Sequence, residues 1–572
     1  MFTLQLRELG RPVWMALVKI MVVTCVFIGL VRTGCAATTY YVDFNGGSDS
    51  NAGTTTSTAW RTIPGTRNTG DSAFKSTSWG SINSSNKVPA GTIIKLKSGT
   101  THSSTNGGKV LIDASYYTTS ATFANPIIFQ RDTSWGSGSV TVDGSGITAG
   151  SSSGNGLIEV LVPGVNVDGV AGVTNGYDGI IIRNSQRIGL DYYSTSPIDG
   201  GTVQFIKFLN NGTLYSSLGN AGAGSGQLFF KYHDHVRINW CEFDGAGNYF
   251  NGTHFGQTSK RATDVIVTNS VAHNHNGSDD TDTGIGFKAE NSQVKWVNCE
   301  AYGNDKGWDS GDEGADPSWD AIYTLLNCSV HDNQTIGAGF SDRGFVGLRS
   351  PGKGKYYIIN SVIRNNPGIG IKMYAGPYEA YIVHNVFASN AFNLLAHVDG
   401  SGDHNRVRVY YYNNVFYKSS NEADWAAAYW FDSGYDAEYH GDYNSYIQNS
   451  TEQGISLGSY GDGSNQYSFA FGSNGPGHTS GTWYNFKSWH NDAHSKGTGA
   501  TDSTLPPFTS VTNNDFSLKA QYAGLNLSTQ AWYIPDMAKD RKGLPRTTWD
   551  IGAYEFGSNL TLSAPTNLRI TN

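Results

Sequence analysis

Four residues occupy the same position in successive turns of a repeat, and their types could support acid–base chemistry. Each of them follows a glycine and an apolar residue, and the four are Lys288, Asp309, Ser341 and Lys372. Side chains alternate between the two faces of a strand, so an inward apolar residue leaves the next residue outward. Because stacked strands lie ~4.8 Å apart, these residues should form a line on one outer face. A solvated surface row is the simpler interpretation for any single member.

Aspartates are concentrated in two neighbouring coils around the first lysine of this line. Asp279, Asp280 and Asp282 lie in an enlarged loop before it, and Asp309 and Asp312 follow in the next coil. So many carboxylates repel one another unless a cation joins them. Calcium takes six to eight oxygen ligands at ~2.3–2.6 Å and suits a flexible carboxylate cluster. We therefore predict a calcium site with these five ligands, and a hydrated acidic surface is the alternative.

A basic segment, residues 342–355, lies in the coil after that, in a chain of which only 15% is charged. The guanidinium group of arginine suits the carboxylates of sugars. We expect Arg343 to be a second catalytic residue beside Lys288. An equally acceptable interpretation is a loop that only confers solubility. The predicted substrate-binding residues are Trp308, Arg349, Lys353 and Lys372.

Together these groups fit β-elimination of a polymer that contains uronic acid. The proton on C5 of the sugar lies next to the carboxylate and is too weakly acidic to leave unaided. A calcium ion would neutralise that carboxylate and stabilise the developing negative charge. A neutral Lys288 would then remove the proton. Free lysine has a pKa of ~10.4, so the amine needs neighbouring positive charge to be neutral near working pH.

The element that must position these residues is a repeat running from Val236 to Tyr417. Seven segments share apolar residues, usually an Asn, a small residue and another apolar pair, at intervals of 24 to 33 residues. A period in this range with short β-type segments indicates a solenoid whose turns bury their apolar faces by stacking. We predict an all-β fold, a single-stranded right-handed parallel β-helix with capped ends, in which side-chain amides of the Asn column bond between coils. The small-residue column reads Cys241, Ser270, Cys299, Cys328, Ser361, Asn385 and Asn414.

Composition agrees with a secreted β-rich protein. Glycine accounts for 71 of 572 residues and the net charge is −8, which argues against a nucleic-acid partner. Cys299 and Cys328 occupy adjacent coils, but stacked side chains point in parallel, which suits a disulfide badly. We expect free thiols, and no Cys–His pattern indicates zinc. No feature indicates obligate oligomerisation, so we expect a monomer.

The chain is predicted to have three parts. Residues 1–37 read as a signal peptide, with basic residues before an apolar run of about twelve, which is short for a membrane span. A lipid anchor at Cys35 is the weaker alternative. Residues 38–556 are the β-helix domain, and 557–572 form a polar tail. We therefore predict a secreted, extracellular or periplasmic protein with no membrane contact after cleavage of the signal.

Part of the repeat resembles polysaccharide lyase family 9, the pectate-lyase-like enzymes. The resemblance covers about residues 265–335 and rests on Gly286-Phe287-Lys288, on the coil Asn298-Cys299-Glu-Ala301 to Lys306-Gly307-Trp308-Asp309, and on Leu326-Asn327-Cys328-Ser-Val330. Residues 39–63, 89–99 and 550–556 resemble the caps of secreted β-helix proteins. The resemblance implies a ten-coil right-handed β-helix, β-elimination, and Lys288 as the catalytic base.

The sequence departs from that family at two places near the lysine. The family carries its calcium aspartates on the coils before the lysine, where this chain offers only Asp244, Asn248 and Asn251. The family continues with Leu-Gly-Gly, where this chain has Ala289-Glu290-Asn291. Three alternatives stay open: a glycoside hydrolase that uses a carboxyl pair, a C5-epimerase of uronic acids, and a noncatalytic carbohydrate-binding or adhesion protein.

Overall fold

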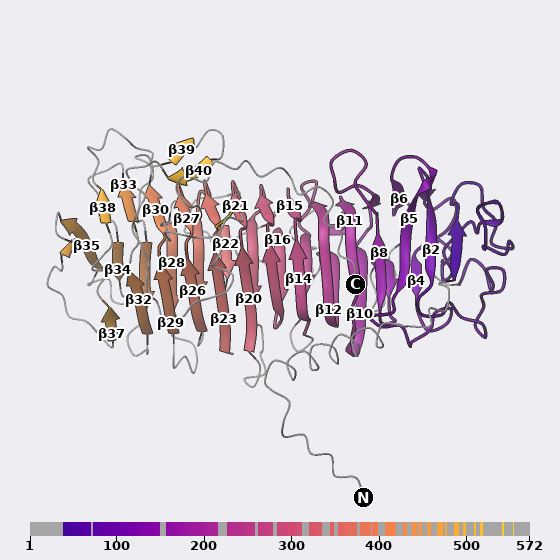
Figure 1. Ribbon diagram of the computed structural model, residues 1–572, viewed down its shortest axis with the longest axis horizontal. Coiled ribbons are helices and arrows are strands. Elements are labelled where there is room, and N and C mark those ends of the chain that lie inside the picture. The colour runs from indigo at the N-terminus through magenta and orange to yellow at the C-terminus, as the bar shows by residue number, and fades with distance from the viewer. Residues whose placement is uncertain are drawn as a thin grey trace, which may run out of the picture.

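The computed structural model is a long parallel β-helix (Figure 1). It describes residues 38–333 except 70–72, 149–155, 216–225, 258–260, 278–282 and 312–319; from residue 344 it describes mainly the strands. The predicted signal peptide and polar tail lie outside the described residues. Of the strands, 38 belong to one continuous hydrogen-bonded sheet. The predicted fold, a right-handed parallel β-helix, is confirmed.

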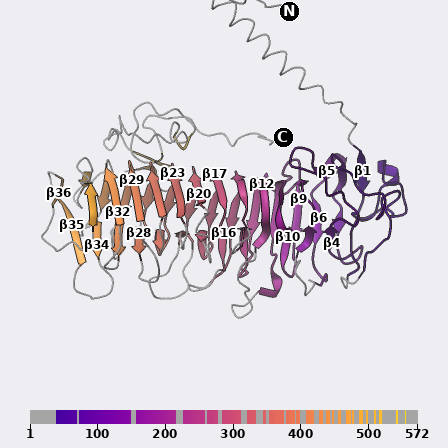
Figure 2. The same cartoon turned by 90° about the horizontal axis from the view of Figure 1, so that it is seen from below.

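The strand pairings divide the sheet into three faces of parallel strands, which we number 1 to 3. Figure 2 shows the stacked coils from below. Face 1 carries the predicted Lys288 row. Its strands, in pairing order, are β4 (Val110–Ile112), β7 (Gly156–Val160), β10 (Ile188–Asp199), β12 (Gly226–Asp244), β13 (Asn251–Phe255), β16 (Ile285–Glu290), β19 (Lys306–Gly311), β22 (Gly344–Gly347), β25 (Ile369–Tyr374), β28 (Phe392–Val398), β31 (Ala427–Phe431) and β34 (Ile455–Gly458).

Face 2 follows in each coil and holds most of the longer strands. Its strands are β1 (Thr39–Val42), β2 (Ile93–Ser98), β5 (Ile127–Gly136), β8 (Val165–Asp168), β11 (Thr202–Leu209), β12, β14 (Thr263–Thr268), β17 (Gln293–Val297), β20 (Asp320–Leu326), β23 (Lys353–Ile359), β26 (Tyr378–Val383), β29 (Val407–Tyr412), β32 (Ala437–Asp442) and β37 (Phe486–His490).

Face 3 closes each coil with short strands. Its strands are β3 (Thr101–His102), β6 (Val140–Asp143), β9 (Ile180–Arg183), β11, β12, β15 (Val271–His273), β18 (Glu300–Tyr302), β21 (Ser329–His331), β24 (Val362–Arg364), β27 (Val386–Ala388), β30 (Val415–Lys418), β33 (Ser445–Gln448) and β38 (Lys496–Thr498). Strand β12 turns through all three faces, and single residues with positive φ (Tyr232, His235 and Trp240) lie along it.

The Asn column predicted from the repeat marks the corner between faces 2 and 3. Its members have φ between 51° and 57°, a left-handed conformation that Asn adopts more readily than most residues. The residues are Asn269, Asn298, Asn327, Asn360 and Asn413. The predicted amide ladder is present, since Asn298 Nδ2 donates to Asn269 Oδ1 at 3.3 Å and Asn269 Nδ2 donates to Asn239 Oδ1 at 3.0 Å.

A second amide ladder, which the sequence reading did not separate, lies at the corner that leads from face 3 back to face 1. The side chains of Asn304, Asn333, Asn366 and Asn390 are fully buried. Each donates from Nδ2 to Oδ1 of the next, at 3.2, 3.0 and 2.8 Å. These amides satisfy buried backbone groups at the turn, so they hold successive coils in register.

The main core is an apolar column inside the coils, and smaller clusters of buried apolar residues lie outside it. Inward residues stack on their counterparts one coil away, as Phe387 does on Phe416 with ring centroids 4.8 Å apart. Cys241, Cys299 and Cys328 lie in this core as free thiols, as predicted. Burial raises the pKa of the Cys241 thiol to about 12, which keeps that thiol protonated and unreactive.

Other elements close the two ends and one side of the helix. Short 3-10 helices occur at Thr56–Thr58 (η1) and Thr213–Tyr215 (η2), and β35 (Gln466–Gly472) and β36 (Gly475–Gly477) add antiparallel pairs to the last coils. The hairpin of β39 (Phe508–Ser510) and β40 (Asp515–Leu518) packs back against face 3, where Arg364 lies 5.5 Å from the Phe516 ring centroid. Within the described residues, no helix has the length and apolar character needed to cross a membrane.

Candidate functional site

The predicted row on face 1 exists, with one member corrected. Lys288 on β16 is in register with Asp309 on β19, as expected. The next member is Val346 on β22, which pairs with Asp309 and with Lys372 on β25 and occupies the place predicted for Ser341. The error arose because Gly339-Phe340-Ser341 and Gly344-Phe345-Val346 carry the same pattern, and only strand pairing selects between them.

Lys288 faces outward and is nevertheless buried. Its neighbours Phe287 and Ala289 are in the apolar core, so alternation directs Lys288 and Glu290 to the opposite side of β16. The side chain of Lys288 is only 3% exposed and that of Glu290 only 7%. A buried ammonium or carboxylate group costs free energy unless it is paired, so the partners of these two residues decide what the site can do.

Three side chains form a compact charged cluster. Lys288 Nζ lies 2.8 Å from Glu290 Oε1, and His254 Nε2 lies 3.3 Å from the same oxygen. His254 comes from β13, one coil earlier, where its Cα is in register with that of Lys288. Its ring is fully buried and stacks on Phe229 of β12, with centroids 4.7 Å apart. We call Lys288, Glu290 and His254 the buried triad.

Electrostatics ties the three members of the buried triad together. Burial by itself would raise the pKa of Glu290, but the positive charges and hydrogen bonds of His254 and Lys288 outweigh it and hold that pKa well below its usual range. The carboxylate is therefore ionised, and one additional proton makes the triad neutral.

Asp309 is the one predicted calcium ligand whose side chain the structure describes. It is partly exposed and adjoins Lys288 across the β16–β19 pairing. Its carboxylate is a hard oxygen donor of the kind calcium prefers, so this residue fits one side of a calcium site. The other predicted ligands, Asp279, Asp280, Asp282 and Asp312, lie outside the described residues.

The predicted substrate-binding residues have different outcomes. Trp308 is fully buried and stacks on Phe287 at 4.9 Å between centroids. It belongs to the core, so the prediction that it contacts substrate is wrong; alternation places its ring opposite to Asp309. For Lys353 and Lys372 only the backbone is described, in β23 and β25. Arg343 and Arg349 fall outside the described part of the chain.

A second group of titratable residues lies on face 3, away from the buried triad. Glu242 and Asp244 of β12 and His273 of β15 bring potential metal ligands within 4.8 Å of one another. Lys207 Nζ lies 3.0 Å from Glu242 Oε1 and 4.0 Å from Asp244 Oδ2, so an ammonium group already offsets part of the negative charge of the two carboxylates. Calcium prefers oxygen ligands, and this cluster also contains a histidine and an ammonium group. We therefore assign no metal there.

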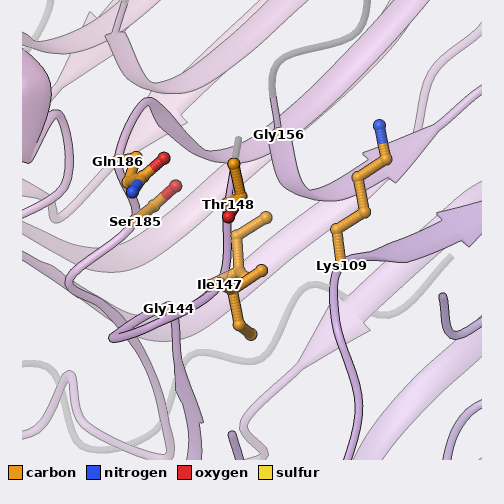
Figure 3. A pocket seen from close by; sticks show the side chains of 8 residues that line it. Lys109, Gly144, Ile147, Thr148, Gly156, Ser185 and Gln186 are labelled. Carbon is orange, nitrogen blue, oxygen red and sulfur yellow. The ribbon is translucent and has the colours of Figure 1, made fainter. Parts of the chain in front are cut away.

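A small pocket opens at the turns beside face 1, four strand steps before β16 (Figure 3). Lys109 is the one ionisable residue in its lining, and its Nζ lies 3.3 Å from Glu159 Oε2. The pocket contains no group of the predicted row. Its lining residues are Lys109, Gly144, Ile147, Thr148, Gly156, Leu157, Ser185 and Gln186.

Sequence reasoning missed two members of the buried triad. Glu290 departs from the family motif, and its spacing of two from Lys288 already places both side chains on one side of a strand. His254 lies 34 residues before Lys288 in an irregular coil without the repeat pattern. The sequence Asn251-Gly-Thr-His-Phe255 alternates weakly, and that was the available signal.

Comparison with known proteins shows a likeness of architecture. No protein-family model matches the chain, and no curated protein sequence does. The solved structure of pectate lyase Pel9A is similar over 91% of this chain and 97% of its own, at 14% identity and a TM-score of 0.38. A rhamnogalacturonan lyase matches over 66% and 82%, at 14% and 0.35. The periplasmic alginate epimerase AlgG matches over 62% and 76%, at 12% and 0.35.

Proposed function

We propose that this protein is a secreted polysaccharide lyase that cleaves a polymer containing uronic acid by β-elimination at Lys288. The observation that carries the proposal is the buried triad on the outer side of face 1. A lysine ammonium held 2.8 Å from an ionised carboxylate, with a histidine 3.3 Å from that carboxylate, is a proton-transfer arrangement. An ordinary surface row would leave its lysine solvated.

The reaction needs a base at C5 of the uronic acid and a proton for the departing oxygen at C4. The base removes the C5 proton, the C–H electron pair forms the C4–C5 double bond, and the C4–O bond breaks. In the proposal the neutral amine of Lys288 takes the proton. Arg343, the second predicted catalytic residue, remains a prediction, and water can supply the proton that the departing oxygen takes up.

The buried triad offers a route to a neutral Lys288. With the extra proton on His254, Lys288 is an amine and the triad still carries no net charge. Burial therefore penalises this state no more than the state with a lysine ammonium. Positive charge near Lys288 would move the proton toward His254.

Calcium is the proposed source of that positive charge, held by Asp309 together with the predicted acidic loop. When bound, calcium would neutralise the substrate carboxylate and stabilise negative charge that develops at C5. Asp309 adjoins Lys288 across one strand pairing, so a cation at Asp309 and the amine at Lys288 would approach the same sugar.

The test is to incubate the protein with polygalacturonate and with alginate, in the presence of calcium or of a chelator. A lyase produces ultraviolet absorbance from the new double bond, and the Lys288→Ala variant should lower kcat/KM by at least ~10²-fold. Reducing sugar without that absorbance would show a hydrolase instead. Inverted sugar stereochemistry without chain cleavage would show an epimerase, and an unaffected Lys288→Ala variant would remove Lys288 from the mechanism.

A further inference from the structure

A second lysine on face 1 lies near the buried triad, on the side toward the N-terminus. Lys231 of β12 points outward, is partly exposed, and is in register with Tyr193 of β10. Lys372 of β25, also on face 1, lies on the opposite side of Lys288 along the coil axis. Lys231 therefore gives face 1 positive charge on both sides of the reacting centre.

Neighbouring side chains, among them Tyr193, Phe229 and Gln257, hold the ammonium group of Lys231 in place. Its Nζ lies 5.3 Å from the ring centroid of Tyr193 and 5.8 Å from that of Phe229. It also donates a hydrogen bond to Oε1 of Gln257. Cation–π contacts within ~6 Å favour a fixed ammonium position. A pre-positioned cation loses less conformational entropy when it binds an anion than a freely rotating one does.

A glycine, Gly256, lies between Lys231 and the buried triad on face 1. Because Phe230 pairs with Phe255 and Phe255 with Ala289, the residue between Lys231 and Glu290 in their outward column is Gly256. A Cβ atom on Gly256 would meet the carbonyl oxygen of Glu290 at 2.1 Å, and the φ angle of Gly256 is +74°. The backbone thus requires glycine, so no side chain branches from the position between Lys231 and Glu290, which are two strand spacings, ~9.6 Å, apart.

We propose that Lys231, with Tyr193 and Gln257, forms a subsite that binds the carboxylate of a sugar residue next to the one cleaved. This rests on the proposed function, since it places a neighbouring residue of the same acidic polymer over Gly256. The ammonium of Lys231 pairs with the carboxylate, and the amide of Gln257 and the hydroxyl of Tyr193 are within the same patch for the sugar hydroxyls. The subsite selects uronic acid over its methyl ester because the ester has no charge to pair.

The experiment measures equilibrium binding in a Lys288→Ala background, so that turnover does not interfere. The probes are polygalacturonate, alginate and fully methyl-esterified polygalacturonate, titrated at low salt. One of the two acidic polymers should bind to the background protein. Adding Lys231→Met should lower the affinity for that polymer roughly tenfold or more, and the affinity for the ester should not change. Lys231→Arg should keep most of the affinity. Lys295→Met, on face 2 and also partly exposed, is the matched control and should bind like the background protein.

Each outcome bears on one proposal or the other. Unchanged affinity in Lys231→Met, or an equal loss for the acidic polymer and its ester, would overturn the subsite. Absence of binding to both acidic polymers in the background protein would overturn it as well. Loss of affinity confined to the acidic polymer supports the subsite even if the native enzyme releases no unsaturated product, in which case only the lyase reaction fails. In the native background, Lys231→Met should raise KM and leave kcat nearly unchanged.

Discussion

Replacing Glu290 by Gln tests whether the buried triad is a charged unit. The substitution keeps the shape and removes the negative charge from between Lys288 and His254, at 2.8 and 3.3 Å. At an effective dielectric constant of ~20, attraction across 2.8 Å is about 6 kcal/mol, part of which only offsets the cost of burying the charges. Removing one partner of such a pair typically costs ~3–5 kcal/mol. We expect the free energy of unfolding to fall by that amount at pH 7.

The pH dependence gives this prediction a second readout. Because the pKa of Glu290 is lowered in the folded protein, its contribution to stability is fully present above the unfolded pKa, ~4.5. It is lost as pH falls below that value, by ~1.4 kcal/mol per pH unit. The difference between the native protein and Glu290→Gln should therefore be constant from pH 5 to 7 and shrink at pH 4 and 3.

The assay is denaturant unfolding followed by circular dichroism at several pH values. Glu300→Gln is the matched control, because Glu300 also pairs with a histidine, His331, at 2.8 Å but its side chain is 47% exposed. Exposed pairs contribute at most ~1 kcal/mol. A loss below about 1 kcal/mol for Glu290→Gln, or a difference that does not shrink in acid, would refute the charged triad. If Lys288 is the base, this variant should also reach full turnover at a lower pH, since no carboxylate stabilises the ammonium.

Three further substitutions probe the scaffold. Trp308→Ala should lower the free energy of unfolding by ~3–5 kcal/mol, through a cavity in the core; retained stability with weakened polymer binding would restore the surface role for this residue. Asn333→Ala interrupts the buried amide ladder and should cost ~1–3 kcal/mol, and an unchanged denaturation midpoint would show that the ladder is dispensable. Burial would raise the pKa of Glu242, but its hydrogen bond to His273 and the charge of Lys207 lower it. Glu242→Gln should therefore destabilise the protein at pH 7 and progressively less below pH ~4.5, in thermal unfolding followed across that range; equal destabilisation at all pH values would contradict this.

Much of the fold could be predicted because the same residue types recur at the same positions of successive coils. Asn at one corner of every coil is favoured by the left-handed conformation there, and small residues such as Cys299 and Cys328 fit the next inward position. The register of Lys288 with Asp309 followed from counting, since both segments carry the same glycine and aromatic pattern. The prediction that Trp308 binds substrate is wrong, and alternation along the strand already indicates that Trp308 points into the core when Asp309 points outward.

The sequence by itself determined the β-helix, its corners, and the placement of Lys288 beside Asp309, because each depends on residues close together in one coil or on a regular period. Only the tertiary structure decided which strand follows Asp309, and it brought His254 to Glu290 from 36 residues earlier. Which residues of two coils lie side by side depends on the length of the loop between their strands. Loop length can vary while the strand sequences keep the same pattern. The pairing of strands therefore brings together the buried triad and the group of Lys231, Tyr193 and Gln257. No local sequence pattern predicts either of them.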